Sequence, residues 1–316
     1  MVDISDQNVI SFIVPVLNRE KYIGQCLEHI LREAGEQDEV IVVDNGSTDG
    51  TLRIVGQYPR VKILQEPEVT IAALRNRGAR VAMGDLFAFI DSDCLVCPGW
   101  RNAVTAALDD PRIHAVGSRY NIPGQATWVE HAWYSMRMDH VAPVTYINAG
   151  NLIVKREVFE TISGFDENLV TDEDYEFGVR LNRLGYCIME VPGIRVIHLG
   201  NAKTLAEFFR KEKWHSTSGL KFTVGGCLDR PMVMTIMFIV GCLTAVVLLA
   251  FAFAGDVNFF FVPVAILIVP AATAGYRVYQ YGNYRFFFHL VVLYCAFFCA
   301  REVTAFKFLL GRHSRA

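Results

Sequence analysis

The sequence predicts an α/β domain with a mostly parallel sheet, followed by apolar helices that could cross a membrane. In residues 9–90, short apolar runs alternate with helix-like stretches, which is typical of a parallel sheet covered by helices on both faces. Long apolar runs fill the last quarter of the 316-residue chain and raise its hydrophobic content to 52%. The net charge of -3 does not favour a nucleic-acid partner.

The individual elements follow from the spacing of apolar residues. Strands are predicted where apolar residues form a short run, and helices where they recur every three or four positions. The predicted strands are residues 9–16, 40–43, 61–64, 86–90, 114–117 and 152–154, with extended pieces at 188 and 191–197. The predicted helices are 22–33, 51–57, 71–83, 101–108 and 173–184. Ser47 or Thr48 is expected to cap the second helix, and the stretch around Trp128, Trp133 and Tyr134 to be rich in loops.

Two aspartates follow the strand at 86–90, in the stretch DLFAFIDSD. Asp91 and Asp93 stand where this buried strand meets solvent. Carboxylates this close repel each other unless a cation lies between them. Ligands of open α/β sheets gather at the carboxyl ends of strands. The stretch therefore predicts either a metal site at a strand end or a polar loop.

Two earlier strands also end in polar residues. The stretch FIVPVLNRE places Asn18 and Glu20 after a strand, and VIVVDNGSTDGT places Asp44 there. Asp44 could accept a hydrogen bond from a base edge, while Gly46 would let the backbone approach a ligand. A plain strand–turn–helix connection is the alternative. If these loops share one sheet edge with Asp91, a nucleotide could lie across that edge.

An acidic cluster opens the helix predicted at 173–184. In TDEDYEFGVR, Asp172 and Glu176 are explained as caps or dipole partners in a first helical turn. Glu173 and Asp174 could instead direct a carboxylate into a cleft.

The last third of the sequence has the composition of a membrane segment. Residues 203–214 form a helix with an apolar face and several lysines, typical of a membrane interface helix or of an ordinary surface helix. Residues 232–254 and 257–276 are long enough to span a bilayer. The third run, 286–300, either spans with a polar end or bends along the interface.

Basic residues predict the orientation. Four of them precede the first span, while the 255–258 connection has none, so the N-terminal domain is expected to be cytoplasmic. These residues are Lys211, Lys213, Lys221 and Arg230. The chain is thus expected to be a multi-pass protein of the inner (plasma) membrane. Arg312, His313 and Arg315 would favour the cytoplasmic side as well, which requires an even number of crossings.

Five stretches together resemble the family 2 glycosyltransferases, which have the GT-A fold, a Rossmann-like, mostly parallel sheet. The resemblance runs from Phe12 to His198. The stretches are FIVPVLNREKYIGQCLEHIL, VIVVDNGSTDGT, ALRNRGARVAMGDLFAFIDSD, NAGNLIVKREVFETISGFDE and EDYEFGVRLNRLGY. The resemblance implies an enzyme, similar to the hexosyltransferases, that binds a nucleotide-diphosphate sugar, with a UDP-sugar as the favoured donor.

The resemblance assigns nucleotide-binding roles residue by residue. It implies that Pro15, Asn18 and Glu20 line the base and ribose pocket. Asp44 would contact the base, and Arg75 would approach the nucleotide.

The same resemblance assigns the chemistry. It implies that Asp91 and Asp93 form a DxD motif that holds Mg²⁺ or Mn²⁺ against the diphosphate, with Asp91 also contacting the donor. Asp174 matches the catalytic base of an inverting displacement, and Glu173 is the next candidate. His198 follows a strand where some related enzymes supply a metal ligand, although it could equally be structural.

The expected chain has three parts: a GT-A domain at 1–200, an amphipathic interface segment at 201–230 and a membrane domain at 231–316. The expected function is sugar transfer to a lipid-linked acceptor in polysaccharide or glycolipid synthesis. The alternatives are a soluble or protein acceptor, and a catalytically silent binding subunit of a polysaccharide-export complex. Processive relatives carry QxxRW, whereas Arg210 to Trp214 give a degenerate RxxKW here. Trp214 could therefore stack on an acceptor sugar or anchor the interface.

Overall fold

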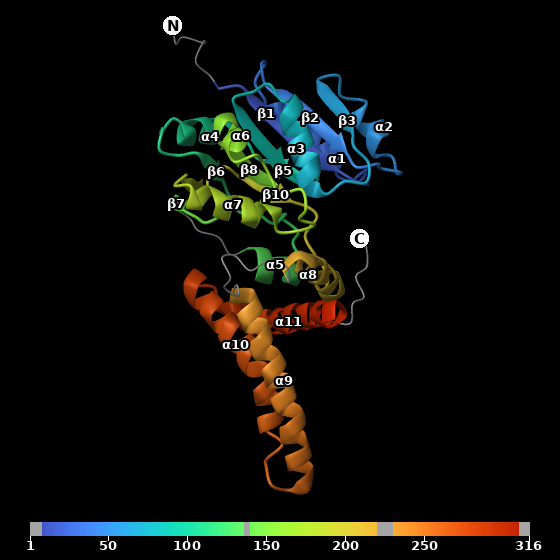
Figure 1. The fold of residues 1–316 in the computed structure, drawn as a ribbon, viewed down its shortest axis with the longest axis vertical. Coiled ribbons are helices and arrows are strands. Elements are labelled where there is room, and N and C mark those ends of the chain that lie inside the picture. Colours follow the sequence, from blue (N-terminus) through green and yellow to red (C-terminus); the bar gives the residue numbers. More distant parts are fainter. Residues whose placement is uncertain (1–7, 136–139, 220–229, 310–316) are drawn as a thin grey trace. The chain divides into compact units, whose positions relative to one another are not determined.

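The computed structural model describes residues 8–135, 140–219 and 230–309 (Figure 1). These residues divide into two compact units, and the chain changes from the first to the second at Gly200–Asn201. Residues 124–135 also belong to the second unit. Lys221 and the basic positions 312–315, which contributed to the predicted orientation, lie outside the described residues.

The first unit is built on an eight-stranded sheet. Its order is β3 (Val61–Gln65), β2 (Glu39–Asp44), β1 (Ile10–Val16), β4 (Leu86–Ile90), β8 (Asn151–Lys155), β6 (Ala115–Gly117), β9 (Ile188–Glu190) and β7 (Ala142–Pro143). Strands β3, β2, β1 and β4 are parallel, as are β6 and β9. Strand β8 runs antiparallel between β4 and β6, and β7 is antiparallel to β9. A two-stranded sheet pairs β5 (Cys94–Val96) with β10 (Val196–His198). The mostly parallel α/β architecture is confirmed.

Helices cover both faces of this sheet because successive strand residues point to opposite sides. Phe12 packs into one core with α1 (Ile23–Glu33) and α4 (Trp100–Leu108). Its neighbour Ile13 packs into the other core with α3 (Ile71–Val81), α6 (Arg156–Thr161) and α7 (Glu173–Arg183). Pro15, which lacks an N–H, pairs with Val43 of β2 at a level beyond the last β1–β4 pair, Ile13 with Phe89.

Two local predictions are wrong. The stretch around Trp128 contains a helix, α5 (Trp128–Tyr134), because Thr127 and Glu130 form a reciprocal capping box. The spacing of Thr127 and Glu130 is the signal that could have predicted this helix. Helix α2 (Thr51–Val55) begins after Gly50 and has no side-chain cap, because the Ser47 hydroxyl instead accepts a hydrogen bond from the Asn18 amide.

The second unit contains the apolar helices. They are α8 (Leu205–Gly219), α9 (Arg230–Ala254), α10 (Phe261–Tyr281), η2 (Tyr284–Phe286) and α11 (Phe287–Leu309). Three segments, 231–254, 261–281 and 284–304, are long and apolar enough to cross a membrane, which supports membrane association. Helices α9 and α10 form a hairpin whose close approach requires a glycine, since a Cβ at Gly241 would lie 2.5 Å from the Ala265 carbonyl oxygen.

Candidate active site

The carboxyl ends of three parallel strands meet at one edge of the sheet. Val16 at the end of β1 pairs with Asp44 at the end of β2, and β4 runs alongside β1 in the same direction. The loops at 17–20, 45–50 and 91–93 therefore emerge from the same edge. Such an edge is where open α/β sheets bind ligands.

Asp44 is a buried carboxylate with one oxygen that has no hydrogen-bond partner in the structure. Only 1% of the residue is exposed, and Oδ2 accepts hydrogen bonds from the amides of Gly46 (3.0 Å) and Ser47 (2.9 Å). Its Oδ1 is buried and unpaired among the described residues. Because an unpaired buried acceptor costs free energy, Oδ1 suits a ligand that donates an N–H or O–H.

Asn18 and Glu20 fasten the loop that follows Asp44. The Asn18 side-chain oxygen accepts a hydrogen bond from the Thr48 amide at 2.9 Å, and a Glu20 carboxylate oxygen accepts one from the Gly50 amide at 2.8 Å. Asn18 adopts a positive φ of 50°, which turns the chain back toward this loop. Pro15 is buried in β1. Their roles in nucleotide binding stay predictions.

Arg75 joins two predicted site residues that are far apart in the sequence. The guanidinium, on α3, is 4% exposed. Its Nη2 donates to Asp91 Oδ1 at 2.9 Å, and its Nη1 donates to Glu173 Oε1 at the start of α7. Burial opposes the charge of the guanidinium, but the carboxylates of Glu173 and Asp91 outweigh burial and raise the pKa of Arg75.

Asp174 follows directly in the first turn of α7. Its Oδ2 accepts hydrogen bonds from the Ala149 amide at 3.2 Å and the Asn148 side chain at 3.4 Å. Burial raises the pKa of Asp174, and the charge of Arg75 and two amides offset this only in part. Burial likewise raises the pKa of Glu173 to about 7, against the opposing charge of Arg75. Two adjacent carboxyls thus have raised pKa values, a common property of acid–base sites.

Asp93, Cys94 and His198 form a cluster with the geometry of a metal site. One potential ligand atom from each lies within 4.8 Å of the other two, and His198 Nε2 is 3.2 Å from Asp93 Oδ1. A Cβ at Gly200 would lie 2.1 Å from Asp93 Oδ2, so only glycine leaves room beside this carboxylate. Carboxylate and imidazole donors fit a divalent cation.

Asp91 lies outside this cluster, although it was predicted as a ligand with Asp93. Besides Arg75, its carboxylate contacts the Tyr120 hydroxyl at 3.3 Å. The Tyr120 ring stacks on His198 with centroids 4.6 Å apart. Tyr120 therefore connects Asp91 to the Asp93–His198 group.

Several of these neighbours were not predicted from the sequence. Arg19 lies 3.7 Å from Asp93, in a loop already expected at the site. Asn148 and Ala149 belong to NAGN, which carried the family resemblance and could have indicated them. Nothing in the local sequence singles out Tyr120 or Cys94 as part of the site.

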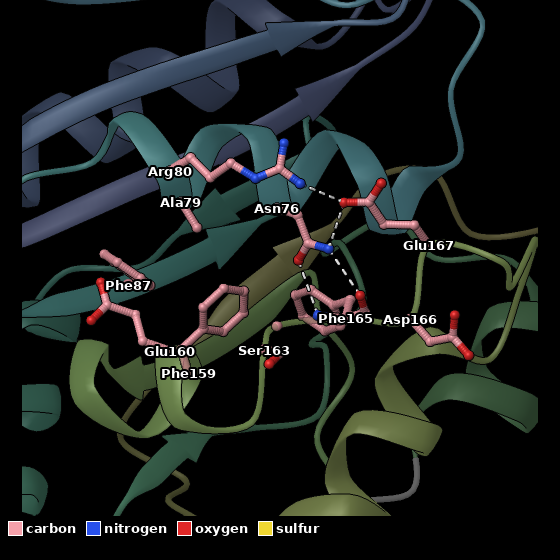
Figure 2. A pocket seen from close by; sticks show the side chains of 11 residues that line it. Asn76, Ala79, Arg80, Phe87, Phe159, Glu160, Ser163, Phe165, Asp166 and Glu167 are labelled. Carbon is pink, nitrogen blue, oxygen red and sulfur yellow. Dashed lines mark hydrogen bonds and ion pairs between the residues drawn. The ribbon is translucent and has the colours of Figure 1, made fainter.

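A pocket of about 500 Å³ is lined by none of the predicted site residues (Figure 2). It lies between α3 and residues 159–167. Asn76 holds this segment through paired hydrogen bonds with the backbone of Phe165, at 2.8 and 3.0 Å. The Phe165 ring lies 5.8 Å from the Arg75 guanidinium. The segment that lines this pocket therefore packs near Arg75 through the ring of Phe165.

The chain is similar to known glycosyltransferases. Residues 11–162 match the profile described as Glycosyl transferase family 2. The chain is 27% identical over 215 residues to the glycosyltransferase AglE of Haloferax volcanii, covering 64% of this chain and 70% of that one. It is 28% identical over 228 residues to the O-antigen biosynthesis protein RfbC of Myxococcus xanthus, covering 63% of this chain but 18% of that one.

Solved structures share the fold at low identity. The mannosyltransferase PcManGT of Pyrobaculum calidifontis, in complex with GDP-Man and Mn²⁺, is 19% identical with a TM-score of 0.61, covering 98% of this chain and 89% of that one. TarS of S. aureus, in complex with UDP-GlcNAc, is 18% identical with a TM-score of 0.50, covering 97% and 93%. These likenesses confirm the expected GT-A fold.

Proposed function

The chain contains a family 2 glycosyltransferase domain at residues 11–162, and from this premise we propose the reaction that it performs. It transfers a sugar from a nucleotide-diphosphate sugar, with inversion at the anomeric carbon, to a lipid-linked acceptor at the cytoplasmic membrane face. The observation that carries this proposal is the grouping of Asp93 with His198, and of Asp91 with Arg75 and Glu173, beside Asp174 at one sheet edge.

Asp44 binds the base of the donor in this proposal. Its buried, unpaired Oδ1 suits an N–H of the base, whose donation would remove the cost of an unsatisfied acceptor. The loop around Gly46, fastened by Asn18 and Glu20, presents the carboxylate to the ligand. A UDP-sugar is the donor that we expect.

Asp44→Asn should weaken binding of the nucleoside diphosphate about tenfold to a hundredfold. The backbone amides of Gly46 and Ser47 need an acceptor, so the side-chain oxygen of the asparagine would take the Oδ2 position. Its NH₂ group would then take the Oδ1 position and donate where the ligand needs an acceptor. Calorimetry with UDP and GDP measures this. Asp110→Asn, the same change at an aspartate paired with Arg112 in the same unit, is the control. Unchanged affinity in Asp44→Asn would remove Asp44 from the binding site.

Asp174 is the general base. The amide of Ala149 and the side chain of Asn148 hold one of its oxygens and fix the orientation of the carboxylate. It accepts the proton of the acceptor hydroxyl as that oxygen forms a bond to the anomeric carbon and the bond to the diphosphate breaks. Its raised pKa makes it a better proton acceptor than an ordinary aspartate.

Asp93 and His198, with Asp91 as a further predicted ligand, would hold a divalent cation. When bound, Mn²⁺ or Mg²⁺ neutralises charge on the departing diphosphate. The imidazole favours Mn²⁺, because Mg²⁺ prefers oxygen ligands alone. Arg75 keeps Asp91 and Glu173 in place, and its charge lies beside Asp174.

The rate of transfer should already fall as the pH is lowered from neutral, where ordinary carboxylates are still fully ionised. The base must be ionised, and the pKa values of Asp174 and Glu173 are both raised, the latter to about 7. Protonation therefore begins near neutral pH and removes activity as the pH falls. Glu173→Gln removes the group that titrates near 7, so the acidic limb of its kcat profile should move to lower pH. An unmoved limb would show that Glu173 does not contribute to it.

The lipid acceptor is supported by the apolar helices that follow the catalytic domain in the chain. Helix α8, with Trp214 46% exposed, begins shortly after His198 and precedes the first candidate span. A charged, aromatic helix of this kind suits the headgroup region. The name of the Myxococcus relative, an O-antigen biosynthesis protein, points to the same class of acceptor.

The proposal is tested with the purified full chain, Mn²⁺ and a panel of UDP- and GDP-sugars. We expect transfer to extracted membrane lipid, and Trp214→Ala should raise the KM for that acceptor several-fold while leaving the KM for donor unchanged. Trp128→Ala, at another exposed tryptophan of the same unit, is the matched control. Transfer to soluble sugars or proteins alone would replace the lipid acceptor. Absence of both transfer and donor hydrolysis would favour a silent binding subunit.

A further inference from the structure

Helix α11 is long and apolar enough to span a bilayer, yet it packs lengthwise against the charged helix α8. Ser216 near the end of α8 hydrogen-bonds to Thr304 of α11 at 2.7 Å. Eight residues earlier, Phe208 of α8 contacts Trp133, which in turn contacts Tyr294 of α11. A step of eight residues along α8 thus corresponds to a step of ten along α11, so the two helices run side by side and lie at the same depth.

The composition of α8 excludes the hydrocarbon region as that depth. Between Phe208 and Ser216 it carries Arg210, Lys211, Glu212 and Lys213. Charged side chains are costly at the centre of a bilayer and are tolerated at the headgroup level. A spanning α11 would draw these residues into the bilayer, whereas an α11 in the interface leaves them near water.

The α9–α10 hairpin has the features of a segment that crosses the membrane. At its tip Phe259, Phe260 and Phe261 are exposed, and at the other end of α10 Tyr276 and Tyr279 are exposed. Aromatic residues gather at both interfaces of a membrane. From Phe261 to Tyr279 the helix rises about 27 Å, close to the thickness of the hydrocarbon core.

The first part of α11 lies beside the tyrosine end of α10. Arg277, between Tyr276 and Tyr279, contacts the Tyr294 hydroxyl at 3.4 Å, and its guanidinium lies 4.5 Å from the Trp133 ring. In Figure 1, α11 runs across the hairpin formed by α9 and α10 rather than alongside it. Tyr294 therefore marks an interfacial position within α11, well past its first turn.

The exposed apolar residues of α11 lie on one face of the helix, toward its two ends. At 3.6 residues per turn they fall within about 60° of one another around the helix axis. They are Phe288, Val292, Val303 and Phe306, whereas Cys295 and Cys299 between them are half-buried and Cys299 packs against the other helices. The opposite face packs against the other helices through residues such as Leu290, Leu293 and Phe298. An apolar face of this kind fits the acyl surface of a bilayer.

We infer that α11 lies in the plane of the membrane, between α8 and the lipid acyl chains, so that the chain crosses the bilayer only twice, through α9 and α10. The partner of this surface is the lipid bilayer itself. The inference does not depend on the sugar-transfer reaction.

Spin labels on the full chain in vesicles test the orientation by depth. Phe288→Cys and Val303→Cys lie about 22 Å apart along α11. Both labels should show the same depth to within about 10 Å, while Met237→Cys and Phe253→Cys on α9, the matched pair of a spanning helix, should differ by about 20 Å. A depth difference above about 10 Å on α11 would overturn the inference.

A second measurement keeps the native cysteines and so avoids variants that fail to fold. Epitopes are placed before Met1, between Gly255 and Asp256, and after Ala316, and each is exposed to protease in sealed vesicles. The two terminal epitopes should be cleaved from the same side, and the hairpin epitope from the other. A C-terminal epitope on the side of the hairpin would show a third crossing and overturn the inference.

Discussion

Asp93→Ala is expected to reduce sugar transfer on the order of a thousandfold or more while the domain stays folded. The substitution removes the carboxylate that lies 3.2 Å from His198 Nε2, and with it one of the proposed oxygen ligands of the cation. Loss of the cation forfeits several kcal/mol of transition-state stabilisation, and each 1.4 kcal/mol is a factor of ten in rate. Transfer of labelled sugar, measured with saturating Mn²⁺, gives the result.

Chelation should have the same effect on the unchanged protein. EDTA should abolish transfer, and added Mn²⁺ should restore it in the original chain but not in Asp93→Ala. Asp110→Ala, at a half-buried aspartate paired with Arg112 in the same unit, controls for removal of a carboxylate. Full activity in EDTA would refute the metal assignment.

Asp174→Asn should lower kcat by roughly two to four orders of magnitude and leave donor affinity near normal. Asparagine is isosteric, and its oxygen can still accept the hydrogen bond from the Ala149 amide, so the position of the side chain is kept. The neutral amide cannot take the proton of the acceptor hydroxyl. Single-turnover kinetics, together with calorimetry of donor binding, separate the two effects.

Asp172→Asn is the matched control for this variant. Asp172 precedes α7 with a φ of 64°, a conformation that asparagine adopts readily, so the helix should be unaffected. If donor affinity collapses in Asp174→Asn while kcat survives, Asp174 binds the donor. Glu173 would then be the next candidate for the base.

Much of the catalytic fold was predictable because its signals are local. Runs such as Leu86–Ile90 are buried strands in the structure with the predicted bounds, and parallel pairing necessarily brings their carboxyl ends to one edge. Asp44 and Asp91 followed from this reasoning, since each stands at the end of such a run. The family resemblance added the roles, and it covered the stretches that carry Arg75 and Asp174.

The spacing of apolar residues was insufficient where a helix depends on its N-cap, or where its direction depends on the helices that it packs against. Helix α5 depends on the Thr127–Glu130 capping box, a signal separate from the apolar spacing that predicts the other helices. The apolar run at 286–300 was compatible both with a span and with a helix along the interface. Hydropathy measures only the composition of a helix, whereas its direction depends on which neighbours it packs against.

The sequence by itself determined the parallel sheet, the polar strand ends and the apolar C-terminal helices, because apolar periodicity and chain direction fix these locally. Only the tertiary structure decided which polar groups meet. Arg75 pairs with Glu173 across 98 residues, and His198 reaches Asp93 because β10 pairs with β5. It also placed Tyr120 between Asp91 and His198. Such contacts depend on how distant segments pack, and a buried charge selects its partner by proximity in space, which spacing along the chain does not encode.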